Sequence, residues 1–294
     1  MAQPNTQLAS LPDDCLAAVL ALLPFSERLT ACAQMSALQS LQRLHVSSYD
    51  QAQDTWRPLG KLPALTELVL SYCCYMPSPK YLSCLVHLQS LSLTATPGSS
   101  TGRLDDDCAQ ELEAALAALQ RAPLTQLEML DCYYVDLPPP PLSRLTSLCS
   151  LRFPNDPPPR PGRIRLPAGG WLRTLQRLEL SYKLIQVERA RKQLEAAAQL
   201  QELIVTNVPM PRFGLPLPPL HFLPWAAARP HMRRLTLGLS HDWPLESREA
   251  QTDLDALTAA AAQVQRSSPG LTIRIVPGDE LHPEEQGLAW DPFA

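Results

Sequence analysis

Apolar residues recur along this chain in a fixed frame of four positions. Two apolar residues lie three apart, a third follows after the same interval, and it begins an alternating apolar-x-apolar pair. The full copies are Leu62, Leu65, Leu68, Leu70; Leu85, Leu88, Leu91, Leu93; Leu124, Leu127, Leu130, Cys132; Leu145, Leu148, Leu151, Phe153; and Leu172, Leu175, Leu178, Leu180. Shorter copies end at Leu44 and Val46, Leu203 and Val205, Leu235 and Leu237, and Ile273 and Ile275. Alternation with period two puts both apolar side chains on one face of a short strand, so the frame predicts a stack of strand-containing units.

This frame resembles that of the leucine-rich-repeat family over roughly residues 38–276. The resemblance implies an α/β solenoid with short parallel strands on the concave side, and helices and proline-rich loops on the convex side. Successive full copies lie about 21 to nearly 40 residues apart, a wider spread than regular repeats show. We therefore expect an irregular solenoid, with 37–276 as its domain.

The segments between the predicted strands are of two kinds. Residues 105–121, 187–200 and 246–266 carry apolar residues at helical spacing and predict amphipathic helices that cover the convex side. Prolines cluster at 138–141, 154–161 and 209–224. Because proline lacks a backbone donor and has a fixed φ, these clusters predict loops or stiff connectors.

Residues 1–36 do not follow the frame and predict a helical block. Asp13 and Asp14 suit the start of a helix, and Pro24 ends it before a second helix begins. The block resembles the start of an F-box, and the matching positions are Leu11, Pro12, Leu16, Val19, Leu20, Leu23, Pro24 and Leu29. The resemblance implies that these residues bind a Skp-type adaptor. The alternative is a helical cap that shields the first repeat from solvent, which a solenoid needs at its ends.

Composition narrows the classes of partner. The chain is 45% hydrophobic and 18% charged with a formal net charge of −4, which argues against broad electrostatic binding of nucleic acid. No apolar run approaches the length of a membrane span, and the N-terminus lacks the pattern of a secretory signal. The 8 cysteines include no C-x-x-C pair, which favours reduced thiols and a cytoplasmic or nuclear location. Residues 277–294 form an acidic tail that we expect to be flexible.

No catalytic, cofactor-binding or metal-binding motif is present. The 6 histidines are scattered, and the nucleophile-elbow, phosphate-loop and zinc-protease patterns do not occur. We therefore expect a non-enzymatic protein without a cofactor or metal.

A binding face can be predicted from the positions between the apolar ones, because alternate side chains of a strand point to opposite faces. These side chains would lie on the concave, solvent-facing side and mix aromatic, charged and polar groups, which suits a protein partner. The candidates are Tyr72, Asp131, Tyr133, Tyr134, Arg152, Glu179, Tyr182 and Arg234.

Together the two resemblances imply a substrate-recognition subunit of an SCF-type, cullin-based ubiquitin ligase. The N-terminal helices would bind the adaptor, and through it the cullin scaffold, while the repeat face would hold a protein substrate. The alternative is a leucine-rich-repeat scaffold for protein interactions with no role in ubiquitin transfer. A third expectation is a regulator of another enzyme, with Arg152 or Asn155 as the exposed repeat-edge residue.

Overall fold

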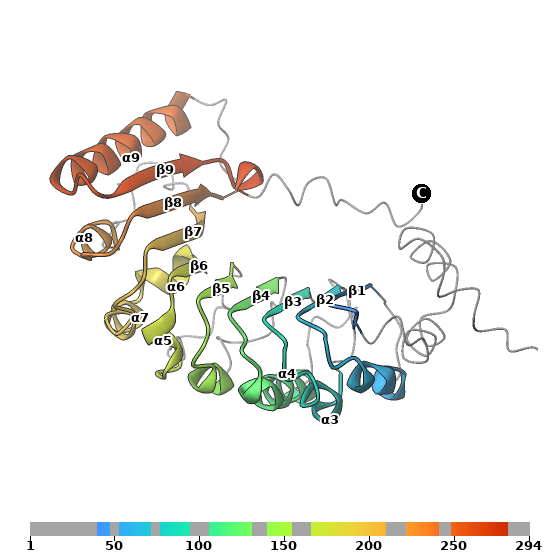
Figure 1. Ribbon diagram of the computed structural model, residues 1–294. Coiled ribbons are helices and arrows are strands. Elements are labelled where there is room, and N and C mark those ends of the chain that lie inside the picture. The colour runs from blue at the N-terminus through green and yellow to red at the C-terminus, as the bar shows by residue number, and fades with distance from the viewer. Residues whose placement is uncertain are drawn as a thin grey trace, which may run out of the picture. The chain divides into compact units, whose positions relative to one another are not determined.

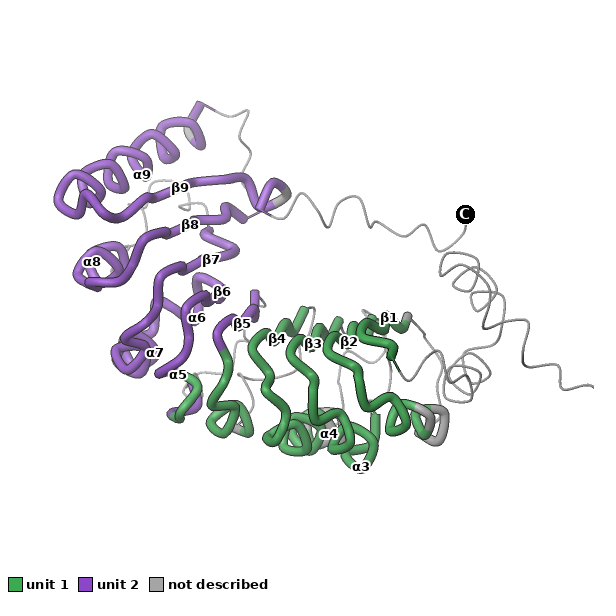
Figure 2. Tube along the Cα trace, in the orientation of Figure 1, with its two compact units in different colours: residues 1–148, 169–171 green, residues 149–168, 172–294 purple. Residues whose placement is uncertain are grey.

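The computed structural model describes residues 40–47, 53–71, 77–94, 106–130, 140–154, 166–209, 222–240 and 248–281. The chain divides into two compact units, coloured separately in Figure 2. Unit 1 comprises residues 1–148 and 169–171, and unit 2 comprises residues 149–168 and 172–294. The predicted helical block 1–36, and with it every predicted adaptor-binding residue, lies outside the described residues.

In unit 1 short strands alternate with helical segments, which lie on one side of the strands (Figure 1). The elements in chain order are β1 (Arg43–Ser47), the 3₁₀ helix η4 (Gln53–Lys61), β2 (Glu67–Ser71), α3 (Pro79–Leu82), β3 (Ser90–Thr94), α4 (Asp106–Ala118), η5 (Leu119–Arg121), β4 (Gln126–Leu130) and η6 (Pro140–Arg144).

The described part of unit 2 also alternates strands with helices. Its elements are β5 (Ser150–Phe153), α5 (Trp171–Thr174, which begins in unit 1), β6 (Arg177–Ser181), α6 (Tyr182–Gln186), α7 (Glu188–Leu194), β7 (Glu202–Val208), α8 (Phe222–Ala227), β8 (Arg234–Leu239), α9 (Arg248–Ser267), β9 (Thr272–Val276) and the 3₁₀ helix η7 (Gly278–Glu280).

Within each unit, consecutive strands pair side by side and in parallel, which confirms the predicted α/β class. The frame residues are in register: Leu68 pairs with Leu91 in unit 1, and Leu178 pairs with Leu203 in unit 2. These side chains are at most 1% exposed, so these frame residues lie in the core of each unit, whereas Leu44, Ile273 and Ile275 are half-buried. Burial of each leucine stabilises the fold by about 1.5–3 kcal/mol.

Hydrogen bonds explain why the leucines that precede each strand lie three apart. The Leu65 N–H donates to the Leu62 carbonyl at 3.2 Å, and the Leu148 N–H donates to the Leu145 carbonyl at 3.3 Å. Each bond closes a tight turn that leads into the strand. The carbonyl before one strand then accepts two N–H groups from the start of the next strand, as Gln176 does from Gln201 and Glu202.

One copy of the frame was placed wrongly by the sequence pattern. Leu127 and Met129 are the buried strand residues of β4, because they pair with Leu91 and Leu93. The prediction used Leu130 and Cys132 instead, which is a shift of three residues. Leu124, Leu127 and Leu130 repeat every three residues, so the pattern alone did not distinguish the turn from the strand.

The helix predictions are confirmed in part. The expected helix 105–121 is present as α4 followed by η5, and the expected helix 246–266 is α9. The expected helix 187–200 is shorter, because α7 ends at Leu194. Two of the proline clusters, which were predicted to be loops or connectors, overlap with helices. Pro140 begins η6, and Pro224 lies in the first turn of α8. Proline fits the first turn of a helix, where its missing N–H has no partner to lose.

Candidate functional site

The strand residues between the frame positions form a second set of in-register rows, which we call the ladder face. In unit 2 the first row, at the strand starts, is Ser150, Arg177, Glu202, Arg234 and Thr272. The second row is Arg152, Glu179, Ile204, Thr236 and Arg274. The corresponding rows of unit 1 are Arg43, Glu67, Ser90 and Gln126, and His45, Val69, Ser92 and Glu128. Arg43 Nε and Glu67 Oε2 lie 3.0 Å apart and form an exposed ion pair.

The first row of unit 2 contains a linked set of charges. The Glu202 carboxylate lies between two arginines, with Oε1 3.2 Å from Arg234 Nη1 and Oε2 3.7 Å from Arg177 Nε. The two arginine side chains are 56% and 49% exposed, whereas Glu202 is 22% exposed. One carboxylate therefore holds two guanidinium groups that still reach solvent.

The second row of unit 2 carries a buried ion pair. Arg152 Nε lies 3.1 Å from Glu179 Oε2, and the two side chains are 12% and 1% exposed. Taking a charge out of water costs several kcal/mol, and a close opposite charge offsets most of that cost. Removal of either group would therefore leave the other charge uncompensated. This pair is a structural element of unit 2 rather than an exposed binding contact.

Segments that follow the strands cover the remaining part of this ladder face. The Thr206 hydroxyl donates to the carbonyl of Pro154 at 3.0 Å, so the chain after β5 lies against the end of β7. At Gly238 on β8, a Cβ atom would stand 3.0 Å from Leu281 Cδ2, so residues after β9 lie against β8. Asn207, with φ of 55°, marks a register shift in β7, and its side chain also donates to Pro154.

The prediction that Glu179 and Tyr182 face solvent is therefore wrong. Glu179 is paired and buried, and Tyr182 is the first residue of α6 rather than an edge of the strand. The Tyr182 ring meets Phe222 edge-on, with ring centroids 6.2 Å apart. Burial raises the pKa of the Tyr182 phenol above its ordinary value, and a hydrogen bond with Gln186 opposes that shift. The frame could not predict the burial of Tyr182, because Phe222 lies in a segment outside the frame.

The other predicted partner-binding residues fall into two groups. Arg152 and Arg234 lie on the ladder face as expected, although Arg152 is mostly buried. Tyr72, Asp131, Tyr133 and Tyr134 lie outside the described residues. On β4 the ladder positions are Gln126 and Glu128, a consequence of the shifted frame. Arg274 was missed, although the final frame copy at Ile273 and Ile275 places it between two apolar positions.

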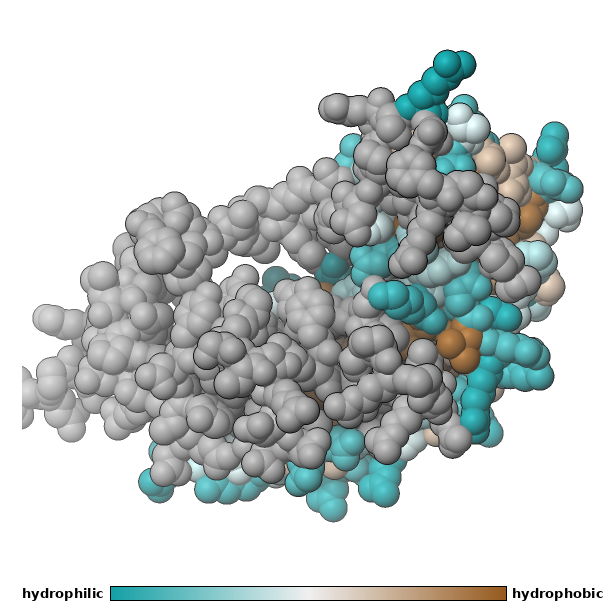
Figure 3. All heavy atoms as spheres, turned by 180° about the vertical axis from the view of Figure 1, so that it is seen from behind, coloured by the Kyte–Doolittle hydropathy of each residue, from teal (hydrophilic) through white to brown (hydrophobic). Residues whose placement is uncertain are grey.

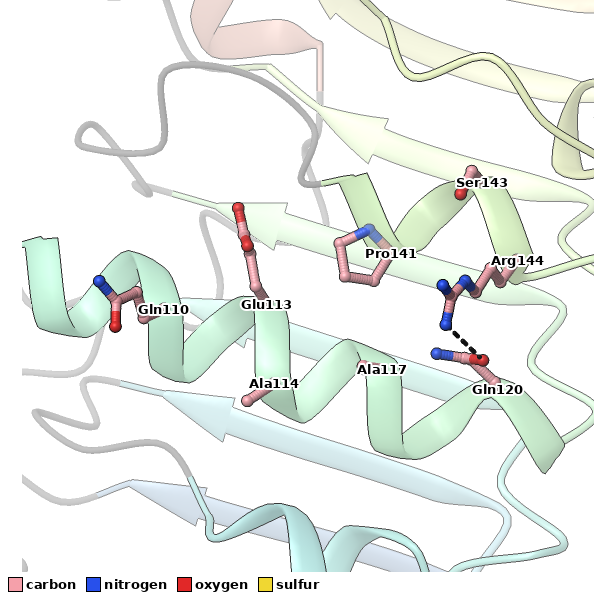
Figure 4. A pocket seen from close by; sticks show the side chains of 8 residues that line it. All are labelled: Gln110, Glu113, Ala114, Ala117, Gln120, Pro141, Ser143 and Arg144. Carbon is pink, nitrogen blue, oxygen red and sulfur yellow. Dashed lines mark hydrogen bonds between the residues drawn. The ribbon is translucent and has the colours of Figure 1, made fainter.

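Unit 1 carries a groove on its helical side (Figure 4). The space is about 470 Å³ and lies between α4 and η6; its lining is Gln110, Glu113, Ala114, Ala117, Gln120, Pro141, Ser143 and Arg144. Arg144 donates to the Gln120 side chain at 3.4 Å across one end. The lining combines small and polar side chains without an aromatic group, unlike most small-molecule sites.

The described surface offers little apolar area for a partner. Among the described residues, the large hydrophobic side chain that is well exposed to solvent is Val86, with an exposed fraction of 45%. On the face shown in Figure 3 the described residues are mostly hydrophilic, with hydrophobic colour in small separate spots. A partner of the described parts would therefore be recognised mainly through polar and charged groups.

No group of three or more His, Cys, Asp and Glu residues gathers in the described part of the chain in a way that could hold a metal ion. Among the helices of the described ranges, none is both long enough and apolar enough to cross a membrane. No protein-family model matches the chain, and no curated protein matches it either.

Proposed function

We propose that the chain is an irregular leucine-rich-repeat solenoid that serves as a substrate-recognition subunit of an SCF-type ubiquitin ligase. The fold part of the proposal is supported by the in-register parallel strands of each unit and by the turn bonds that accompany the leucine frame. The adaptor part rests on the sequence of residues 11–29, where the apolar positions match the start of an F-box.

The observation that carries the binding part is the charged row of unit 2. Arg177, Glu202 and Arg234 are held together on adjacent strands, and both guanidinium groups reach solvent. A fixed, exposed set of charges on a stacked sheet fits recognition of another protein, where charge complementarity gives specificity. Such a subunit needs no catalytic residue, because it acts by holding a target close to a ubiquitin-loaded enzyme. We place this activity in the cytoplasm or nucleus.

Co-purification with a Skp-type adaptor tests the adaptor part. We expect the full chain to retain the adaptor, and the double variant Leu16→Asp, Leu20→Asp to lose it, because two carboxylates would replace apolar residues at positions that match the F-box. The matched control is Leu254→Asp on α9, a half-buried leucine of a different helix. Failure of the wild-type chain to retain the adaptor would contradict the proposal, as would retention by the double variant.

The second candidate is a leucine-rich-repeat scaffold with no role in ubiquitin transfer. The charged row also fits this candidate, because it lies wholly within unit 2 and uses no residue of the N-terminal block. In that case residues 1–36 act only as a cap, and their deletion should destabilise the repeats. A separate F-box module should instead be removable with little change in the unfolding temperature of the remainder.

A further inference from the structure

Three arginines of unit 2 form one exposed surface, which we call the arginine row. Arg177 and Arg234 lie in the first ladder row, and Arg274 lies one strand and two residues away from Arg234 on the same face. All three are exposed. Among the ladder positions of unit 2 the carboxylates are Glu202, which is shared by Arg177 and Arg234, and Glu179, which is buried against Arg152. The surface therefore carries an excess of positive charge.

This excess differs from the character of the chain as a whole, whose formal net charge is −4. Like charges placed close together on a sheet face are unfavourable unless something offsets them. Glu202 offsets part of the repulsion between Arg177 and Arg234, but no ladder-face carboxylate of the described unit 2 is paired with Arg274. A negatively charged group of a partner would offset the remaining positive charge of the three arginines.

Glu202 also prepares the two arginines for binding. Its carboxylate accepts a hydrogen bond from Arg234 Nη1 at 3.2 Å and lies within ion-pair distance of Arg177 Nε, at 3.7 Å. A guanidinium has five N–H donors in a planar fork, so the edges that Glu202 does not use can still bind another carboxylate. Side chains that are already held in place lose less conformational entropy when a ligand binds.

The rest of the ladder face limits where a partner can reach. Ile204, Thr206 and Thr236 are 4%, 6% and 6% exposed, so the middle and far ends of β7 and β8 are closed to a ligand. The strand starts and the last strand remain, and these are the positions of the three arginines. A partner would thus cross the strands at their starts instead of filling the whole face.

Strand spacing sets the pattern that such a partner needs. Arg177 and Arg234 lie on β6 and β8, separated by two strand spacings, or roughly 9–10 Å. In a polyproline II segment, which is extended and has three residues per turn, residues three apart lie on the same side and about 9 Å apart. Acidic side chains at every third position of such a segment would therefore match Arg177 and Arg234.

We infer that the arginine row binds an extended, acidic segment of a protein partner. Nucleic acid is a poorer fit, because a backbone of closely spaced phosphates calls for a longer basic stripe than three arginines that share a glutamate. The inference deepens the proposed function and rests on it in one respect, since the acidic segment would belong to the recognised substrate. It does not depend on the adaptor, so peptide binding and adaptor binding can fail separately.

The test is a fluorescence-anisotropy titration of the full chain with a labelled peptide of about ten residues, with glutamate at every third position between serines and glycines. The control peptide has glutamine in place of glutamate. The double variant Arg177→Glu, Arg234→Glu should weaken binding of the glutamate peptide at least about tenfold, because repulsion replaces attraction. The matched variant Arg248→Glu, Arg266→Glu makes the same change in charge at exposed positions of α9 and should bind like wild type.

The inference holds if the glutamate peptide binds and the glutamine peptide does not. The Arg177→Glu, Arg234→Glu variant must also lose at least about tenfold in affinity, while the Arg248→Glu, Arg266→Glu variant binds like wild type. Equal losses in both double variants would overturn it, because net charge rather than the row would then be responsible. Arg274→Glu alone provides a second test in a chain whose Glu202 cluster is intact, and unchanged binding there would remove Arg274 from the row. Tighter binding of a mixed-sequence oligonucleotide than of the peptide would overturn the choice of partner.

The arginine row could also bind the acidic residues of this chain's own tail, and this case must be distinguished from binding of a partner. A chain that ends at Leu281 should bind the glutamate peptide with the affinity of the full chain. If only the shortened chain binds, residues 282–294 occupy the row, and the inference of an external partner is wrong. A circular-dichroism melt of each variant confirms that loss of binding does not come from loss of folding.

Discussion

Units 1 and 2 use the same leucine frame, but they treat the opposite face of their strands differently. In β2 and β3 the frame residues are buried and the residues between them are half-exposed. In β7 and β8 both sets are buried over most of the strand. The comparison teaches that the frame determines the core face only. The ladder face is set by the segments that follow the strands, namely the residues after β5 and after β9 in unit 2.

The largest expected effect comes from placing a charge at the same strand position of each unit. Ile204 of β7 and Val69 of β2 both lie between two frame residues, but Ile204 is 4% exposed and Val69 is half-exposed. We expect Ile204→Asp to destabilise the fold by about 4 kcal/mol or more, because it buries an unpaired carboxylate. Val69→Asp should cost only about 1 kcal/mol.

Urea unfolding of both variants gives these free energies. Equal costs would mean that the ladder faces of the two units are covered to the same extent, and the comparison would fail.

The next effect concerns two glutamates at matching strand positions. Glu179 of β6 is buried against Arg152, whereas Glu128 of β4 is half-exposed. Glu179→Ala should cost about 3–5 kcal/mol, because it removes the carboxylate that offsets the charge of the mostly buried Arg152 guanidinium. Glu128→Ala should change the free energy of unfolding by no more than about 0.5 kcal/mol. The double change Arg152→Met, Glu179→Leu should recover most of the loss, and thermal unfolding of all three variants would show whether it does.

These matched pairs also show which parts of the fold the sequence could predict. The period-two alternation identified the strands, and its frame residues are buried at Leu68, Leu91, Leu178 and Leu203. It failed at β4, where leucines three apart extend from the turn into the strand and Met129 takes the last frame position. An apolar pattern reports which side chains avoid water, and at β4 two registers satisfied it equally well.

The candidate site was less predictable than the fold. Glu179 and Tyr182 were expected to face solvent because the pattern of one strand contains no information about what lies over it. Their cover depends on contacts between distant segments, such as Tyr182 with Phe222 and Thr206 with Pro154. Arg274 could have been found by extending the ladder positions to the last copy of the frame.

A smaller effect should follow from removing one hydroxyl. Thr206→Val deletes the donor to the Pro154 carbonyl, and we expect a loss of about 0.5–1.5 kcal/mol. Thr94→Val changes the equivalent, half-exposed position of β3 and should be nearly neutral, with valine favoured in strands. Guanidinium unfolding of the two variants distinguishes them. A neutral Thr206→Val would indicate that the segment after β5 does not hold β7.

The smallest effect is a dependence on pH. Burial raises the pKa of the Tyr182 phenol, so the neutral form is favoured more in the folded state than in the unfolded state. The stability that Tyr182 contributes is therefore complete below its unfolded pKa of about 10 and is lost as the pH rises through the folded value. Unfolding measured between about pH 8 and 11 should show this decline, and Tyr182→Phe should reduce its slope. An unchanged slope in the variant would contradict the buried position of Tyr182.

The central claim is that adaptor binding and partner binding reside in different parts of the chain, and one pull-down tests it directly. An immobilised Skp-type adaptor is incubated with the chain and the labelled glutamate peptide, and both captured chain and captured peptide are measured. The account predicts that wild type captures both, that Arg177→Glu with Arg234→Glu is captured without peptide, and that Leu16→Asp with Leu20→Asp is not captured although it binds peptide in solution. Capture of peptide at the wild-type level by the arginine variant, or no capture of the wild-type chain, would contradict it.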